Sequence, residues 1–360
     1  MTRAYPFRAL AALLLLSLAG LASGAELGQL PADGTAYRNA PVALPFDIAA
    51  LKANWRKRIQ AIKAKGILPI IDIESSFNTM KLDLRSLSRS MDDEGIALVA
   101  YSSNSDGRKW SDGAARVVSA DPWRYMPTTN AGIYPAWTEA PLEFLEATKQ
   151  HALADGYPLL GEFEFRHYPS PRQFRRGETN RDVHIPINGP LGHDLFSFAE
   201  KTGIPFQIHY EIEDTLLPAL EEMLRRYPKA KLIWCHLAQI RYASRSTIYG
   251  PDYVRRLIET YPNLYFDVAF GGPDSVYPGS REHHARIWDR AKGGILKEWS
   301  DLISHYPWRF LAAMDLGGDR QDQVLEHAQR LRMFLSYLPE NAREIVAYKA
   351  AWKLLFGEDL

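Results

Sequence analysis

The chain has 360 residues, of which 46% are hydrophobic and 24% are charged, a composition typical of a globular protein. Its 43 lysines and arginines balance 43 aspartates and glutamates, so the formal net charge is zero. A near-neutral surface offers no general electrostatic attraction for nucleic acid or for an anionic membrane. We therefore expect neither of these as a partner, and we expect a small-molecule substrate instead.

The first 25 residues have the features of a cleavable signal peptide. Arg3 and Arg8 precede an apolar run rich in alanine and leucine, and small residues follow at positions 23–25. The run is shorter than the roughly 20 residues that span a bilayer, so we expect no membrane association once the signal is removed. The sequence thus predicts an exported protein, in a compartment such as the periplasm. Cys235 is the only cysteine, so no intramolecular disulfide can form.

Residues 26–66 are interpreted as an N-terminal extension that contains one helix. Asp47 is suited to cap the start of this helix, and Gly66 is suited to end it. Between them, Trp55 and Ile59 recur at helical spacing on one apolar face. We expect this extra helix to cover one end of the main fold.

Residues 67–360 alternate short apolar runs with amphipathic stretches, the pattern of a parallel α/β fold. Eight of the apolar runs are predicted to be strands: Ile67–Ile73, Ile96–Ser102, Trp123–Thr128, Leu159–Phe165, Ile204–Tyr210, Lys231–His236, Leu264–Ala269 and Arg309–Asp315. Eight strands alternating with helices predict an α/β fold of the (β/α)₈ TIM barrel type, with the extra N-terminal helix and additional C-terminal helices. The first strand is not followed by a glycine-rich phosphate-binding turn, which disfavours an open doubly wound sheet.

Ionisable residues end several of the predicted strands, where barrel enzymes carry their chemistry. They are Asp72, Glu74, Glu162, Glu164, His209, His236, Asp267 and Asp315. Burying this many charges together without partners or a metal would cost several kcal/mol each. We therefore interpret His209, His236 and Asp315 as active-site residues, and Asp267 as structural.

The two glutamates of the fourth predicted strand are harder to assign. Glu162 and Glu164 are two residues apart, so their side chains point to the same face of the strand. One of them can bond to Arg166 or His167 instead of facing a substrate. The sequence leaves open which of the two contributes to the site.

Four strand segments carry motifs in a recognisable order: Ile70–Phe77, Gly203–His209, Leu232–Leu237 and Phe310–Asp315. They resemble the first, fifth, sixth and eighth strands of the amidohydrolase-2 branch of the amidohydrolase superfamily. This branch includes the aminocarboxymuconate-semialdehyde decarboxylase group. The segments Leu338–Ile345 and Leu355–Gly357 are similar to the family's last helices, so the resemblance covers roughly residues 67–357.

The resemblance implies a site for a divalent metal with Glu74, His209 and Asp315 as its protein ligands. The family has Asp-x-His-x-His on its first strand, whereas this chain has Glu74 and Ser76 in place of the two histidines. The neutral hydroxyl of Ser76 binds a divalent cation weakly. Two carboxylates and one imidazole still suit zinc or manganese, with open positions for water and substrate. A metal site that has decayed is the alternative.

The resemblance also implies a division of labour in the site. Asp315 and His236 are the expected catalytic residues: Asp315 accepts a proton from water and His236 polarises the scissile carbonyl. Glu164, Arg166 and Arg241 are expected to bind the substrate, Arg241 by a bidentate contact to a carboxylate.

The expected activity is hydrolysis of an ester, lactone or amide bond in a small organic substrate. One alternative is non-oxidative decarboxylation of a small carboxylic acid on the same barrel. An alternative of another class is a non-catalytic binding protein with a degenerate metal site, which the residue Ser76 favours. A homodimer is the default expectation for the assembly of a soluble enzyme.

Overall fold

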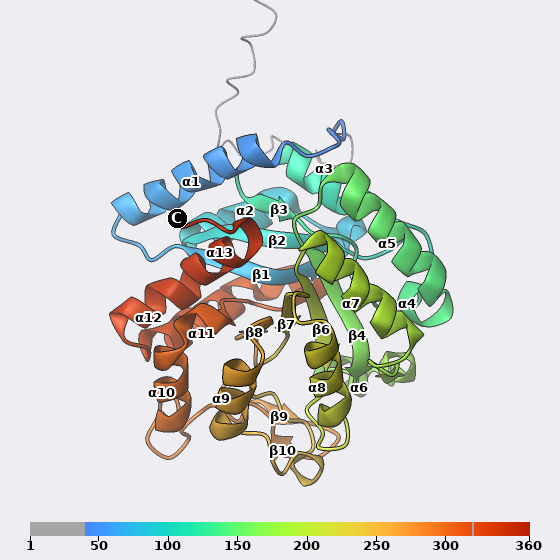
Figure 1. Cartoon of the computed structure of the whole chain (residues 1–360). Coiled ribbons are helices and arrows are strands. Elements are labelled where there is room, and N and C mark those ends of the chain that lie inside the picture. The colour runs from blue at the N-terminus through green and yellow to red at the C-terminus, as the bar shows by residue number, and fades with distance from the viewer. Residues whose placement is uncertain (1–39, 319) are drawn as a thin grey trace, which may run out of the picture.

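The computed structural model describes residues 40–318 and 320–360. The predicted signal peptide and the first part of the predicted extension lie outside the described residues. Mostly parallel strands alternate with helices along the described chain, as a (β/α)₈ barrel requires, and this confirms the predicted fold class (Figure 1). Within the described ranges, no helix is both long and apolar enough to cross a membrane.

The strands and helices have the following bounds. The strands are β1 Ile70–Phe77, β2 Ile96–Ser103, β3 Tyr125–Pro127, β4 Leu160–His167, β5 Val183–His184, β6 Phe206–Tyr210, β7 Leu232–Trp234, β8 Leu264–Asp267, β9 Val276–Tyr277, β10 Glu282–His283, β11 Phe310–Leu311 and β12 Leu316–Gly318. The α-helices are α1 Ile48–Ala64, α2 Leu84–Asp93, α3 Gly113–Ala120, α4 Ala136–Glu139, α5 Pro141–Asp155, α6 Pro171–Arg175, α7 Pro190–Thr202, α8 Leu217–Arg226, α9 Pro251–Thr260, α10 Lys297–His305, α11 Val324–Ser336, α12 Glu340–Glu344 and α13 Ala350–Phe356.

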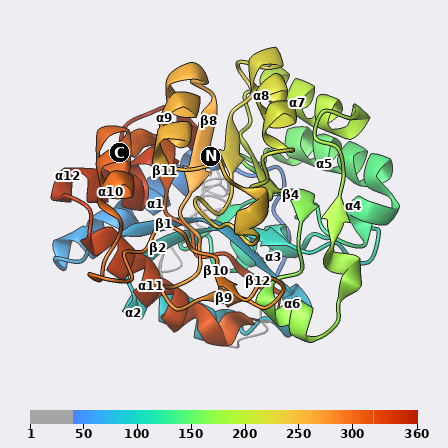
Figure 2. The same ribbon diagram turned by 90° about the horizontal axis from the view of Figure 1, so that it is seen from below.

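The barrel strands form two hydrogen-bonded sheets, in the orders β12-β1-β2-β3 and β11-β8-β7-β6-β4-β5. Neighbours are parallel except for β5, which runs antiparallel to β4. No continuous ladder of hydrogen bonds closes the barrel in the described part of the chain. At one seam the Gly132 amide donates to the Glu162 carbonyl at 2.7 Å, and at the other the Ile73 amide donates to the Ala312 carbonyl at 3.0 Å. Seen from below, the helices surround the strands (Figure 2).

The last predicted strand, Arg309–Asp315, is shorter than expected. Only Phe310–Leu311 pairs with β8, and the chain pairs again as β12 beside β1. Between the two, Asp315 adopts a φ of 49°, in the left-handed region that interrupts a strand. The predicted strand Lys231–His236 likewise ends at Trp234, because His236 has a φ of 65°. In both cases the ionisable residue lies beyond the strand and not within it.

The extra N-terminal helix is present as α1 and packs across the end of the barrel beside α13 (Figure 1). The Asp47 carboxylate caps it by accepting from the Ala50 amide at 3.0 Å. Trp55 is fully buried, donates from its indole nitrogen to the Pro122 carbonyl at 3.0 Å, and stacks on Phe356. One aromatic anchor thus ties the start of the described chain to its last helix.

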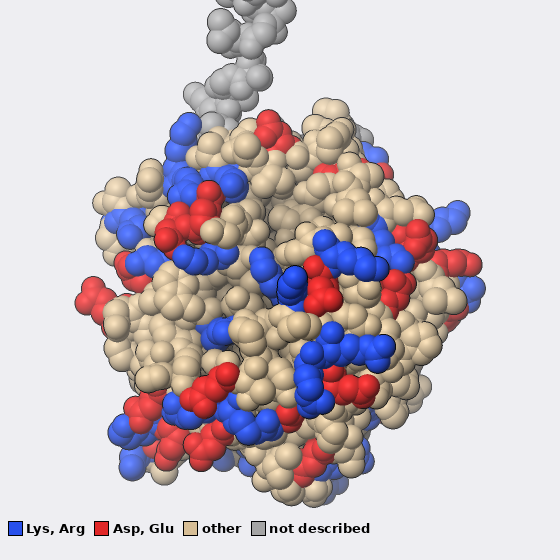
Figure 3. Space-filling view, viewed as in Figure 1, with Lys and Arg blue, Asp and Glu red and all other residues tan. Residues whose placement is uncertain are grey.

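Charged residues of both signs are interspersed over the face shown in Figure 3. This distribution agrees with the zero formal net charge of the sequence.

A buried carboxylate fixes β1 against the segment that follows β11. Asp72 is fully buried, and its Oδ1 accepts from the amides of Glu74 at 3.2 Å and of Met314 at 2.9 Å. Its Oδ2 accepts from the Ser75 hydroxyl at 2.6 Å. Burial raises the pKa of Asp72 to about 7, against the influence of these hydrogen bonds. The Met314 contact holds the neighbouring Asp315 in place at the end of the barrel.

Replacing Asp72 tests this connection. In Asp72→Ala, two buried amides lose their acceptor, and each orphaned donor costs about 1–3 kcal/mol, so we expect the free energy of unfolding to fall by about 2–5 kcal/mol. Asp72→Asn keeps one acceptor oxygen and should lose clearly less. Urea denaturation followed by circular dichroism measures both values. An Asp72→Ala variant as stable as the parent would contradict this role.

Candidate active site

A cavity of about 300 Å³ opens where the C-terminal ends of β1, β4, β6 and β7 meet. Among the residues predicted for the site, the lining includes Glu162, Glu164, His209, His236, Arg241 and Asp315. Strand order explains this convergence, because β4, β6 and β7 are consecutive neighbours in one parallel sheet. Side chains that end these strands are therefore delivered to the same place.

Three of the lining side chains form a compact cluster. The Glu162 Oε1 atom lies 3.0 Å from His209 Nδ1 and 3.2 Å from His236 Nε2, and the two nitrogens lie 3.0 Å apart. Metal–ligand bonds of about 2.0–2.1 Å in a tetrahedral site put ligand atoms roughly 3.3 Å from one another. The cluster therefore has nearly the spacing that one small divalent cation requires, and its three residues can hold such an ion.

Hydrogen bonds on the outer side of the His209 and His236 rings determine the tautomer of each ring. They therefore determine which ring nitrogens present a lone pair to the cluster. His209 Nε2 lies 3.0 Å from Glu211 Oε1, and His236 Nδ1 lies 2.9 Å from the Ala269 carbonyl oxygen. A carboxylate and a carbonyl only accept, so these outer nitrogens carry hydrogen. In the neutral rings, the inner nitrogens are then both acceptors, and they face the third acceptor, Glu162. Fixing the tautomer from the far side of the ring in this way is typical of metal-ligating histidines.

The electrostatics of the cluster favour positive charge. Burial alone would lower the pKa of His236, but the hydrogen bond to Glu162 and the nearby carboxylates of Asp315 and Asp267 raise it to about 10. Burial also opposes the rise for His209, whose pKa is nevertheless raised by its contacts with Glu162 and Glu211. The same two histidines lower the pKa of Glu162, although burial acts in the other direction.

The backbone is strained at two residues of the site. His236 and Asp315 have φ values of 65° and 49°, which cost of the order of 1–3 kcal/mol each for residues other than glycine. Asp267, which is fully buried, holds this turn by accepting from the amides of His236 at 2.8 Å and of Ala269 at 3.0 Å. This is the structural role predicted for Asp267. Asp267 therefore maintains the strained turn at His236, which is itself a member of the cluster.

The predicted ligand set of Glu74, His209 and Asp315 is not brought together as one group in the described structure. His209 belongs to the compact cluster with Glu162 and His236, whereas Glu74 belongs to two other groups that could hold a metal ion, one with Glu162 and Cys235 and one with His236 and Asp267. Glu74 is buried behind the cluster, and its Oε2 is 3.9 Å from His236 Nδ1, the nitrogen that bonds outward. Burial and the nearby Glu162 raise the pKa of Glu74 well above its usual range.

Asp315 lines the cavity from the segment between β11 and β12. Its side chain is 41% exposed, and Oδ1 lies 3.1 Å from Arg320 Nη2. The same Arg320 nitrogen donates to the Asp315 carbonyl oxygen at 2.6 Å. The arginine thus fixes the orientation of a carboxylate that stays accessible to a molecule in the cavity.

The residues predicted to bind substrate divide into two groups. Glu164 and Arg241 line the cavity, whereas Arg166 is not among the lining residues. Arg166 pairs with Asp182 at 2.6 Å and with Glu213 at 3.4 Å.

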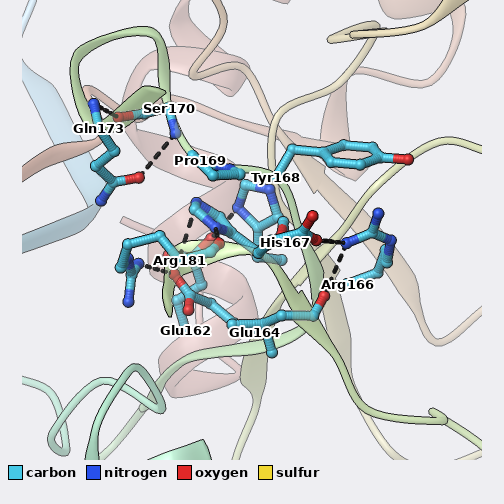
Figure 4. Close-up of polar contacts among 12 residues, drawn as sticks. Glu162, Glu164, Arg166, His167, Tyr168, Pro169, Ser170, Gln173 and Arg181 are labelled. Atoms are coloured by element: carbon cyan, nitrogen blue, oxygen red, sulfur yellow. Dashed lines mark hydrogen bonds and ion pairs between the residues drawn. The ribbon is translucent and has the colours of Figure 1, made fainter. Parts of the chain in front are cut away.

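Arg166 lies on the other side of Glu164 from Arg181, which forms an ion pair with the Glu164 carboxylate (Figure 4). Burial raises the pKa of Glu164 to about 7, although Arg181 opposes the rise. Both strand-four glutamates therefore face the cavity, Glu162 toward the histidines and Glu164 toward an arginine.

Sequence reasoning missed the residues that support the site from loops. Glu211 lies two positions after His209, so in an extended segment the two side chains point to the same face. This spacing is a sequence signal that could have identified Glu211 as a partner of His209. The arginines of the segment 168–182 stand in a short, charge-rich run, but the sequence alone does not show that this run folds over the strand ends. Arg320 lies five residues after Asp315, and no sequence motif indicates that it contacts the site.

Comparison with known proteins places these features in context. A sequence model of the amidohydrolase family, of the amidohydrolase-2 type, matches residues 112–298. No relative of the chain was found among curated proteins.

Solved structures similar to the chain include 2,6-dihydroxybenzoate decarboxylase from Rhizobium, at 12% identity over 80% of this chain and 99% of that one, with a TM-score of 0.47. A phosphotriesterase homology protein from Escherichia coli is similar at 12% identity over 81% and 98%, with a TM-score of 0.46. Amidohydrolase 2 from Bifidobacterium longum subsp. infantis is similar at 12% identity over 80% and 98%, with a TM-score of 0.38.

The contact between Glu211 and His209 leads to a prediction about metal affinity. Glu211→Gln removes the acceptor charge that fixes the His209 tautomer, and loss of such a partner typically weakens metal binding about 10- to 100-fold. Titration of the metal-free variant with zinc, against a competing chelator, measures the change. Glu213→Gln is the matched control, because Glu213 contacts Arg166 and Tyr168 and not His209. Equal affinities in the two variants would show that Glu211 does not support the cluster.

Proposed function

The chain belongs to the amidohydrolase family, and from this premise we propose that it is a metal-dependent hydrolase acting on an ester, lactone or amide bond of a small organic substrate. The observation that carries the proposal is the convergence of Glu162 Oε1, His209 Nδ1 and His236 Nε2 within 3.0–3.2 Å of one another. A non-catalytic barrel has no need for three acceptors that face one another beneath an open cavity. The predicted signal peptide supports the further proposal that the enzyme acts outside the cytoplasm.

The donor set fits a divalent ion with a preference for nitrogen and oxygen. One carboxylate and two imidazoles are a combination found at catalytic zinc sites, and manganese also accepts it. A divalent ion held by these atoms supplies Lewis-acid chemistry, by polarising a carbonyl oxygen and by acidifying water. Ser76 lines the same cavity, but its hydroxyl is not needed for this set of three. We therefore assign His236 to metal binding, and no longer to polarising the carbonyl by itself.

Proton transfer falls to Asp315 in this proposal. Its carboxylate is partly exposed to the cavity and is oriented by Arg320, so it can accept a proton from water and return it to the leaving group. Asp72 acts at a distance, because its bond to the Met314 amide holds the adjacent residue.

Decarboxylation is the second candidate, and the arginine content of the cavity favours it. The lining contains the five arginines Arg172, Arg176, Arg181, Arg241 and Arg320, which suit a substrate that carries a carboxylate. In that reaction Asp315 would deliver a proton to the carbon that carbon dioxide leaves. Both reactions use the same cavity and the same cluster, so they differ in the substrate that is turned over.

Turnover assays decide between these reactions. We expect zinc- or manganese-loaded protein to hydrolyse members of a library of esters, lactones and amides, and chelation to remove that activity. Asp315→Asn should lower the turnover number by about 10²- to 10⁴-fold, the usual contribution of a general acid–base residue, while metal content and the circular dichroism spectrum stay unchanged. Retained activity in Asp315→Asn would exclude it as the proton carrier. Carbon dioxide release from carboxylic acids, without hydrolysis of any library member, would favour the decarboxylase.

A further inference from the structure

A second cavity, of about 280 Å³, lies at the end of the barrel opposite to the candidate active site. Lys231 directly precedes β7, Tyr265 is the second residue of β8, and Arg309 directly precedes β11. These three side chains therefore lie where the strands begin. Helix α13, which lies beside α1 across this end of the barrel, forms another wall of the cavity (Figure 1). The two cavities have no lining residue in common.

Positive charge is unbalanced in this second lining. Lys231, Arg309 and Lys353 contribute three cations, and no aspartate or glutamate of the described chain lines the cavity. Among the described residues, the only ion pair of these cations joins Lys353 to Asp359 at 2.7 Å. Its side chains are 50% and 77% exposed, and a pair this exposed contributes little. The cavity therefore has a positive potential that attracts anions.

Two of the cations have donors that the described chain does not use. Lys231 Nζ contacts the Leu354 carbonyl at 3.5 Å, which is long for a hydrogen bond. Arg309 donates from Nη1 to the carbonyl oxygens of Pro262 and Leu264, and no other acceptor for it is present among the described residues. An ammonium has three N–H groups and a guanidinium has five, so both side chains are held in place with donors left for an anion.

Stabilisation of α13 explains only part of this charge. The Leu354 carbonyl belongs to the last turn of the helix, where a cation interacts favourably with the helix dipole. Lys231 alone meets that need. The additional cations Arg309 and Lys353 around the same cavity are not required for it.

Two aromatic rings complete the lining. Trp308 is 40% exposed, and Lys353 Nζ lies 5.8 Å from the centroid of its ring. The guanidinium carbon of Arg309 lies 5.2 Å from the centroid of the Tyr265 ring. The remaining lining residues, from α13, are apolar and buried. An exposed ring beside cations suits a flat molecule that has both an apolar body and a negative charge.

We propose that this cavity is a binding site, separate from the active site, for a small organic anion that carries a ring. Lys231 and Arg309 bind its oxyanion group, and its ring packs on Trp308. A volume of about 280 Å³ is at the lower end of the range for ligand pockets, which suits a molecule with a single ring. The proposal does not depend on which reaction the barrel catalyses.

The turn before β7 offers a matched pair of variants. Lys231 lines the second cavity, whereas Lys229 is exposed and does not. Replacing either by glutamine removes one positive charge from the same turn. Neither lysine lines the candidate active site, so a difference between the two variants reports binding in the second cavity.

Calorimetric titration of the purified protein with benzoate and with phenylphosphonate tests the proposal. We expect Lys231→Gln to weaken binding of the preferred anion about tenfold, the equivalent of one charge-assisted hydrogen bond, and Lys229→Gln to leave it unchanged. Trp308→Ala should weaken it about two- to tenfold, because the bound ring loses its stacking partner. Thermal unfolding checks that each variant keeps its fold. The anion that the parent binds more tightly identifies the preferred oxyanion group.

Three results would overturn the inference. The first is a parent protein that binds neither anion at millimolar concentration. The second is an equal effect of Lys229→Gln and Lys231→Gln, which would locate any bound anion elsewhere, including in the candidate active site. The third is an equal affinity of the parent for benzoate and for its neutral amide.

Discussion

The structure of the site depends on the mutual approach of two imidazole nitrogens and one carboxylate oxygen. Glu162, His209 and His236 present acceptors to a common point, and no donor from the described chain lies between them. Such an arrangement is unfavourable unless a cation or additional protons occupy it. Glu211 and the Ala269 carbonyl contact the outer nitrogens of His209 and His236, respectively. These contacts keep the lone pairs of the two inner nitrogens directed toward the cluster.

The order of strands in the sheet explains why the geometry of this cluster does not depend on closure of the barrel by hydrogen bonds. The three residues belong to β4, β6 and the end of β7, which are neighbours within one continuous sheet. Their relative positions are set by parallel pairing, for example of Glu164 with His209. Asp315 lies directly before β12, which pairs with β1, and its amide donates to the Glu74 carbonyl at 3.1 Å. The buried Asp72 carboxylate adds a further connection by accepting from the Met314 amide. Backbone pairing thus positions the cluster, and backbone pairing together with a buried side chain positions Asp315.

The sequence was sufficient to predict the barrel and the convergence of ionisable residues at one end of it. Apolar runs followed by a histidine or a carboxylate mark strand ends, and parallel strands bring those ends together. It also placed His209 and His236 in one site. It did not show that the chain turns with positive φ at His236 and Asp315, because these turns depend on contacts with Asp267 and Asp72 on the neighbouring strands β8 and β1.

The choice of metal ligands and the arginines that line the cavity were beyond sequence reasoning for a different reason. Glu74 and Glu162 are both carboxylates at strand ends, and only their three-dimensional surroundings separate them. Glu162 faces two imidazole lone pairs, whereas the Glu74 carboxyl group lies 3.9 Å from His236 Nδ1, the nitrogen that bonds outward. The position of Arg181 depends on how a loop folds over the strands, which no periodic pattern records.

Metal content of two glutamate variants tests the central claim most directly. Protein purified without chelators is loaded with zinc or manganese and measured by elemental analysis, beside Glu162→Gln and Glu74→Gln. The geometry predicts a near-stoichiometric ion in the parent, its loss in Glu162→Gln and its retention in Glu74→Gln. Metal retained in Glu162→Gln but lost in Glu74→Gln, or a parent that binds neither ion, would contradict the assignment of the cluster.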